Sequence, residues 1–209
     1  MDLVVRAYDS LSPAAHEVEI ALTVTNTASW TQDVSVGSFL QFGKRFEKFY
    51  HRCGLGKECV TGRSDLDWLA AASEDVSLAL TAAPGLNPKV LLAQDDILLT
   101  EMAAASLDAG ESLSITQYLV VGDGTIDSAA HRAWELRETP GLRTVLGKVT
   151  LGEDLTDMGD VRVHARVAGS TGKLGWVSSS RPDAGGDVIL HLPDGRYDLT
   201  VTLPGADDR

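Results

Sequence analysis

The chain has 209 residues, of which 44% are hydrophobic, and it carries a formal net charge of −12 at pH 7. That hydrophobic content excludes a wholly disordered chain. No apolar run approaches the roughly 18 residues that a membrane span needs. The 18 basic residues are scattered and outnumbered by 30 acidic ones, which argues against a nucleic-acid-binding surface. The composition therefore predicts a soluble acidic protein with neither a membrane span nor a nucleic-acid partner.

Strand signals dominate the first half of the chain. Residues 3–8 are expected to form a short first strand, and apolar residues alternate with mostly polar ones between Val18 and Val24. Alternation with a period of two is typical of a strand with one buried face. Further strands are expected near residues 34–42, 76–81, 90–93, 97–100 and 113–121.

Residues 44–75 differ in kind, because they are aromatic, basic and glycine-bearing without a sustained period. They are predicted to form a long loop. Two interpretations of its aromatic side chains stay open. They could form a carbohydrate- or ligand-binding surface, or they could cover an open edge or face of the sandwich, and the second is favoured because aromatics in a long loop usually anchor it. If the loop binds a ligand, the residues expected to do so are Tyr50, His51, Arg52 and Trp68.

One helix is predicted, from about Asp127 to Glu138. Asp127 is expected to cap it, apolar residues follow at spacings of three and four, and the sequence from Thr139 to Gly141 ends it. Strands are expected again near residues 145–151, 161–167 and 174–179. Frequent turn signals between short strands, with a single helix, predict an all-β chain.

The chain closes with two alternating apolar runs on either side of Pro193-Asp194-Gly195. This pattern predicts an antiparallel hairpin over residues 188–203, with Gly195 in the left-handed conformation that closes the turn. Tyr197 and Leu199 are expected to face a core, with Arg196 and Asp198 facing solvent.

The segment after the helix resembles the carboxypeptidase regulatory-like domain, a small prealbumin-type β-sandwich. The matching features are Gly147 and Val149, Val161 and Val163, the Asp183–Gly186 turn, Leu192–Tyr197 and Pro204-Gly205. About 60 residues are covered. The resemblance implies a fold but no activity, because this domain is an addition to many secreted and surface proteins.

The first 124 residues resemble the N-terminal β-supersandwich of bacterial PHP-type metallohydrolases of the CehA/McbA kind. The matching features are Val24–Asn26, Phe42-Gly43, Phe49-Tyr50-His51 with Gly54, Asp67-Trp68 and Leu119–Gly124. The resemblance implies a β-supersandwich domain (1–124), a helical connector (125–141) and a regulatory-like sandwich (142–209). It also implies a larger bacterial, extracytoplasmic, metal-dependent hydrolase, whose neighbouring catalytic domain is the partner of this chain.

Catalytic chemistry is not predicted for the chain itself. Its five histidines are dispersed, one to each predicted element: His16, His51, His131, His164 and His191. A zinc site usually includes a close pair of ligands, and neither His-x-His nor Gly-x-Ser-x-Gly occurs. The acidic stretches 123–127 and 153–160 are better explained as solvated turns than as calcium loops. We therefore expect no metal, no cofactor and a non-catalytic accessory or interaction module.

The two cysteines, Cys53 and Cys59, are predicted to form a disulfide, since they are the only pair and share an exposed loop with Gly54 and Gly56. A disulfide favours an extracytoplasmic protein. Met1 is followed directly by strand-like residues without a signal segment. That start leaves open a cytosolic protein or an exported one whose leader has been removed.

Overall fold

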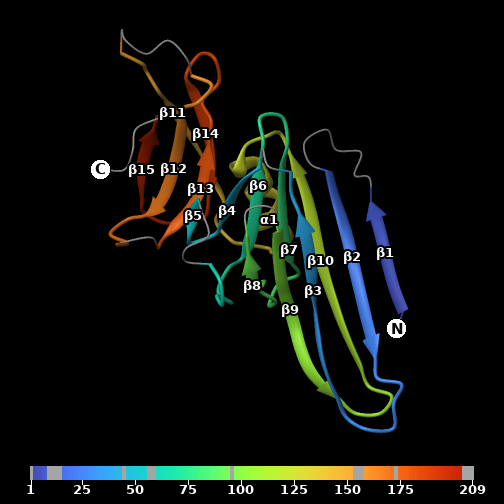
Figure 1. The fold of residues 1–209 in the computed structure, drawn as a ribbon. Helices are drawn as coiled ribbons and strands as arrows, with labels where there is room; N and C mark the ends of the chain where they lie inside the picture. The colour runs from blue at the N-terminus through green and yellow to red at the C-terminus, as the bar shows by residue number, and fades with distance from the viewer. Residues whose placement is uncertain are drawn as a thin grey trace.

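The computed structural model describes residues 2–8, 16–43, 46–55, 60–94, 97–152, 158–171 and 174–203. The chain is all-β with one helix in the described residues. Figure 1 shows a long sandwich that begins at the N-terminus and a smaller group of strands at the C-terminus. Within the described residues no helix is long and apolar enough to cross a membrane.

The largest sheet has seven antiparallel strands and forms the middle layer of the molecule. Their order across the sheet is β1 (Asp2–Tyr8), β2 (His16–Thr25), β10 (Ser112–Gly122), β7 (Ser77–Ala82), β6 (Trp68–Ala72), β4 (Glu47–Tyr50) and β5 (Gly54–Leu55). A second sheet, in the order β3 (Gln32–Gln41), β9 (Ile97–Leu107) and β8 (Lys89–Ala93), packs on one face of it. Side chains of both sheets, among them Val36, Leu80 and Met102, form the core between them.

The predicted loop over residues 44–75 is wrong in part, because β4, β5 and β6 lie within it. β6 is buried along its whole length, and so is the end of β4 at Phe49 and Tyr50. In β4, Phe49 faces one buried cluster and Tyr50 another, and in β6 Ala70 and Leu69 divide in the same way. A strand buried on both faces has no polar alternation, so the pattern that identified the other strands is missing here.

The helix α1 (Ile126–Leu136) packs on the opposite face of the seven-stranded sheet. Its cap is Thr125, whose Oγ1 accepts the Ser128 N–H at 3.1 Å, rather than Asp127. Asp127 lies in the first turn and is buried. The turn expected at residues 123–127 is present, since the Asp123 carboxylate accepts the N–H and O–H of Thr125.

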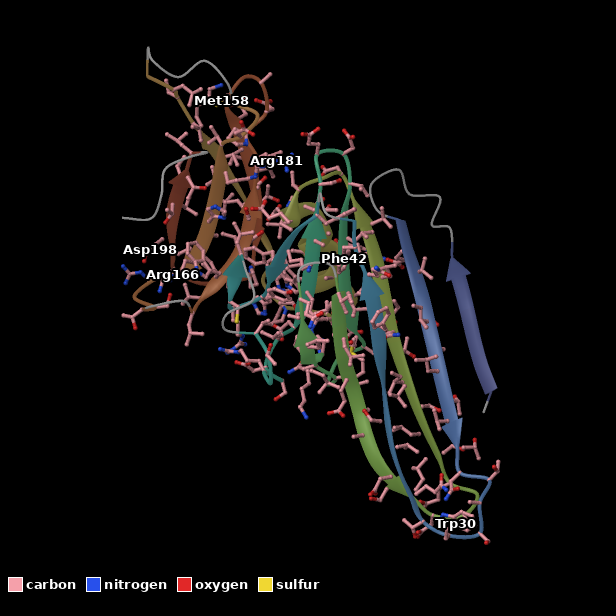
Figure 2. All side chains as sticks on the ribbon, viewed as in Figure 1. Trp30, Phe42, Met158, Arg166, Arg181 and Asp198 are labelled. Atoms are coloured by element: carbon pink, nitrogen blue, oxygen red, sulfur yellow. The ribbon has the colours of Figure 1, made fainter. Side chains whose placement is uncertain are left out.

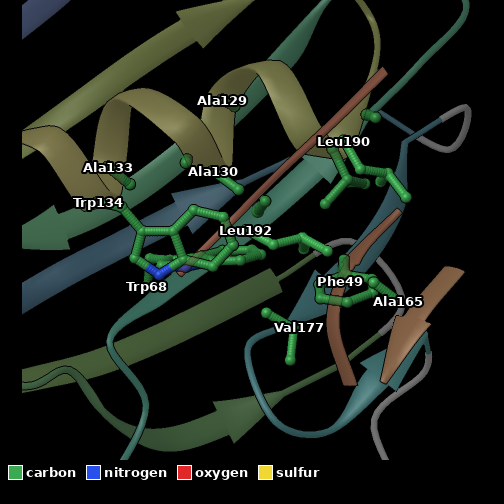
Figure 3. Packing of buried hydrophobic residues seen from close by; sticks show 14 of the residues in the cluster. Phe49, Trp68, Ala129, Ala130, Ala133, Trp134, Ala165, Val177, Leu190 and Leu192 are labelled. Carbon is green, nitrogen blue, oxygen red and sulfur yellow. The ribbon is translucent and has the colours of Figure 1, made fainter. Parts of the chain in front are cut away.

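A small sandwich covers the other side of the helix. One of its sheets pairs β11 (Arg143–Lys148) with β14 (Asp187–Leu192). The other has β12 (Arg162–Val167) between β13 (Trp176–Ser180) and β15 (Tyr197–Thr202). Both sheets contribute buried side chains to one cluster with α1, as Figure 3 shows for Ala165, Val177, Leu190 and Leu192.

The predicted hairpin over residues 188–203 is wrong. β14 pairs with β11 and β15 pairs with β12, so the turn at residues 193–196 carries the chain from one sheet to the other. The Tyr197 hydroxyl donates to the Pro193 carbonyl at 2.8 Å across this corner. Gly195 does not have a positive φ; instead, a Cβ there would lie 2.9 Å from the Tyr197 hydroxyl oxygen.

Leu199 is not a core residue. Its register opposite Ala165 places it on the inner face of its sheet, yet it is 51% exposed. β15 is an edge strand of its sheet. Tyr197, nearer the corner, does pack against the buried cluster as expected.

One buried cluster runs through all three parts of the chain. It joins Phe49 and Ala79 of the large sheet to Trp134 of α1 and to Val163 and Leu190 of the small sandwich. Helix α1 contacts strands of the large sheet on one side and β13 and β14 on the other. The domain boundaries at residues 124 and 141 stay a prediction, and in the folded chain the three parts share this core.

Candidate functional site

A cleft of about 530 Å³ opens where the segment after β4 meets the small sandwich. That volume is in the usual range for small-molecule sites. Polar residues from the first part of the chain lie on one side, and mostly apolar residues of the small sandwich lie on the other. The lining residues are His51, Arg52, Arg63, Asp67, Trp134, Thr139, Val167, Ser170, Leu174, Gly175, Val177, Pro193 and Tyr197.

Backbone hydrogen bonds at Arg52 hold the two sides of the cleft together. The Arg52 N–H donates to the Trp176 carbonyl at 2.6 Å, and the Arg52 carbonyl accepts the Gly175 N–H at 2.8 Å. Arg52 has a φ of 69°, in the left-handed region. At Gly54, with a φ of 78°, a Cβ would lie 2.6 Å from the Trp176 ring, so only glycine fits this close approach.

His51 lies at the base of the cleft with its side chain 8% exposed. Its ring stacks on Trp68 at 5.4 Å and meets the edge of Trp134 at 6.2 Å between centroids. Burial lowers the pKa of His51 to about 4, and the nearby Asp67 carboxylate opposes that shift. The imidazole is therefore neutral at pH 7. Nδ1 lies 3.3 Å from an Asp67 carboxylate oxygen and accepts the Asp67 N–H at 3.2 Å, and the hydrogen bond that it accepts assigns the ring proton to Nε2.

Arginine–aspartate pairs surround this histidine. The Arg63 guanidinium donates two hydrogen bonds to Asp65, at 2.8 and 2.5 Å, and they lower the pKa of the Asp65 carboxyl. Arg52 approaches the same carboxylate less closely, at 3.8 Å. Arg137 lies 3.5 Å from Asp67 and also donates to backbone carbonyls of the large sandwich.

The structure brings two of the four predicted ligand residues, His51 and Arg52, to the cleft. Tyr50 is buried between the two large sheets, and burial raises its pKa to about 12. Trp68 is fully buried against Phe49 and Trp134, as the packing interpretation of the aromatic residues expected. Neither the Tyr50 hydroxyl nor the Trp68 indole N–H has a hydrogen-bond partner in the described part of the chain.

The small-sandwich side of the cleft was not predicted. Val167, Leu174 and Tyr197 are more than 100 residues from His51 in the sequence, and each fits an ordinary strand or turn position. Arg63 and Asp67 belong to the aromatic and basic segment that the sequence singled out. Cys53 is buried beside this segment, while Cys59 lies outside the described residues, so their disulfide stays a prediction.

A second polar cluster corrects the expectation that the histidines are isolated. His131 of α1 and His191 of β14 stack with centroids 3.8 Å apart and ring planes 4° apart. The buried Asp127 carboxylate lies 2.7 Å from the His191 Nδ1 and accepts the His191 N–H and the Ser178 hydroxyl. Hydrogen bonding to Asp127 raises the pKa of His191, whereas burial lowers that of His131.

This cluster joins α1 to both sheets of the small sandwich, because Ser178 is in β13 and His191 in β14. Among the described residues no three histidine, cysteine or acidic side chains are grouped to hold a metal ion. The stacked rings face each other rather than a shared point. The hydrogen bonds and the ring stacking of this cluster hold α1 against the small sandwich.

A larger groove of about 780 Å³ lies between residues 72–75 of the large sandwich and Gly159–Arg162 and Arg181 of the small one. Its lining is almost wholly charged or polar, with Ala72 as the main apolar exception. Arg162 lies 4.0 Å from Glu47 and donates to the Gly159 and Val161 carbonyls. The smaller cleft, which combines apolar walls with converging polar groups, is the better candidate for a ligand site.

No protein-family model matches the chain, and no curated protein matches it either. Among solved structures, a candidate aldose 1-epimerase from Escherichia coli K12 is similar over 59% of this chain and 69% of its own, with 10% identity and a TM-score of 0.36. A polysaccharide lyase is similar over 97% of this chain but only 32% of its own, with 13% identity and a TM-score of 0.42. These similarities assign no activity to the chain.

Proposed function

We propose that this chain is a non-catalytic accessory module that binds a small polar ligand in the cleft, with carbohydrate as the class to test first. The observation that carries the proposal is the cleft's composition. Side chains able to donate hydrogen bonds, from His51, Arg52 and Arg63, face apolar side chains such as Val167 and Leu174. This combination of a few directed polar groups with apolar walls is what holds small ligands in proteins.

We further place the module within a larger extracytoplasmic protein, ahead of a metal-dependent hydrolase domain. The resemblance of residues 1–124 and 142–209 to the front modules of PHP-type metallohydrolases supports this placement. The experiment is to sequence the parent gene past the codon for Arg209. A His-x-His strand downstream would support the hydrolase setting, and a parent with an unrelated downstream domain would refute it.

The cleft itself is tested with a pair of tryptophan substitutions and an array of immobilised glycans. Val167→Trp fills the cleft from β12, whereas Leu146→Trp, at a more exposed position in β11, lies outside it. Glycans bound by the wild type should be lost with Val167→Trp and retained with Leu146→Trp. Binding that survives both substitutions, or no binding of any glycan by the wild type, would refute the cleft as a carbohydrate site.

A further inference from the structure

We infer that the cleft selects a ligand carrying a carboxylate beside an apolar face, the chemistry of an acidic sugar such as a hexuronate. The inference rests on the proposed function, since it names the class of ligand for the same cleft. Three features of the described residues carry it: a hydrogen-bond donor at the base of the cleft without a protein partner, more arginines than carboxylates around it, and an exposed apolar wall.

The donor is the Nε2–H of His51. The opposite ring nitrogen accepts the Asp67 N–H, and Nε2 has no hydrogen-bond partner in the described part of the chain. The side chain is only 8% exposed, but Nε2 is not among the fully enclosed unpaired polar atoms of the described residues, so water or a ligand can reach it. Since His51 lines the cleft, a ligand oxygen can accept this hydrogen bond.

The charge comes from the arginine side chains. Among the described residues here, three arginines face two carboxylates, Asp65 and Asp67, and the neutral His51 adds no charge, so the described side chains carry one more positive charge than negative. Arg52 is the least tightly paired of the three: its side chain is 49% exposed and lies 3.8 Å from Asp65, too far for a hydrogen bond. A guanidinium so placed can turn to a ligand carboxylate and bind it through two parallel hydrogen bonds.

The apolar wall decides between a bare anion and an acidic sugar. Val167 and Leu174 are each more than two-fifths exposed, and the half-buried Tyr197 ring lies beside them. An inorganic anion would leave these side chains in water. A sugar ring presents a face of C–H groups to such a wall while its carboxylate reaches the arginines.

The experiment is a two-dimensional NMR titration of the 209-residue protein with sodium glucuronate, D-glucose and sodium phosphate, at matched ionic strength. Glucuronate should shift the amide resonances of the cleft residues saturably and also shift the His51 Nε2–H resonance. Arg52→Gln and Arg63→Gln should each weaken binding about tenfold or more, the usual effect of losing a charged hydrogen bond. Lys148→Gln is the control, because Lys148 forms an exposed ion pair with Asp187 away from the cleft lining.

The other outcomes separate this inference from the proposed function. Glucose binding as tightly as glucuronate would overturn the carboxylate class while leaving a carbohydrate site in the cleft. Phosphate binding as tightly as glucuronate would show that only charge is recognised, which also overturns it. If the wild type binds a neutral glycan on the array and Val167→Trp abolishes that binding, the proposed function stands and this inference fails. No shift with any of the three probes overturns the inference as well.

Discussion

The two ends of the large sandwich use the same type of residue in opposite ways. At the end beside the small sandwich, Trp68 of β6 and Trp134 of α1 are buried against each other edge to face, with their ring centroids 5.5 Å apart (Figure 3). At the far tip, Trp30 is 65% exposed (Figure 2). There the chain turns with hydrogen bonds instead, since the Asn26 amide donates to the Trp30 and Leu107 carbonyls at 2.8 Å. A tryptophan contributes to the core of this protein where the helix and the small sandwich cover the large sheet, and it stays exposed where they do not.

The sharpest way to break this comparison is to remove one tryptophan from each end. Trp134→Ala leaves a large cavity where the large sheet, α1 and the small sandwich meet, and should lower the free energy of unfolding by about 3–5 kcal/mol. Trp30→Ala should lower it by less than about 0.5 kcal/mol. Urea melts measure both. Equal losses at the two positions would show that the three-layer end is not the better packed one.

The buried histidine at this end should make stability depend on pH. His51 has a pKa of 6.5 when unfolded and about 4 when folded. As the pH falls from 6.5 to 4, the unfolded chain takes up a proton that the folded chain excludes, so stability declines. The decline from this group should total about 3 kcal/mol and level off below pH 4.

The matched variant is His51→Phe, which keeps an aromatic ring against Trp68 but does not titrate. Other groups also titrate in this range, so the quantity to compare is the slope of the unfolding free energy against pH in the two proteins. The variant should be less stable overall, because the Asp67 N–H loses its acceptor. Identical slopes would show that His51 titrates normally and is not enclosed.

Most strands could be predicted from the sequence because most have one solvent-facing side. The segment from Val18 to Val24 alternates, and β2 occupies it. The segment Trp68–Ala72 is wholly buried between two layers, so it carries no alternation. The corner at Pro193 shows a different limit. Turn residues mark where a chain changes direction, but whether the next strand pairs with the last or crosses to a facing sheet depends on the whole sandwich.

One side of the cleft could be predicted from the sequence and the other could not, because only one side has a local sequence signal. The composition of the aromatic and basic segment could be recognised in the sequence, and two of its residues, His51 and Arg52, line the cleft. The facing wall is built from ordinary strand and turn residues, such as Val167 and Leu174, that become a site only through tertiary contact. The stacking of His131 on His191, 60 positions apart, has no local signal either.

The two ends of the large sandwich can also be compared by removing one carboxylate from each, Asp127 beside the small sandwich and Asp108 at the far tip. Asp127 accepts hydrogen bonds from His191 and Ser178, so Asp127→Ala should cost about 2–3 kcal/mol by leaving their donors unpaired. The Asp108 carboxylate, at the far tip, accepts one exposed hydrogen bond from the Thr31 hydroxyl among the described residues, and Asp108→Ala should cost about 0.5–1 kcal/mol. Thermal melts give the difference. An NMR titration should also show the pKa of His191 falling in Asp127→Ala, and an unchanged pKa would contradict the hydrogen bond.

Apart from the two substitutions at the far tip, the smallest expected effect is that of the cysteine pair, which would stabilise the segment between β4 and β6. Cys53 packs in a buried cluster with Tyr50 and Leu66, so a bond from it to Cys59 would tie this segment to the core. Closing so short a loop should contribute roughly 2 kcal/mol in the chain-entropy model. Intact-mass analysis after alkylation without reductant should show no added label, and reduction should lower the urea midpoint. Two labels on natively secreted protein would contradict the disulfide and remove the main support for an oxidising compartment.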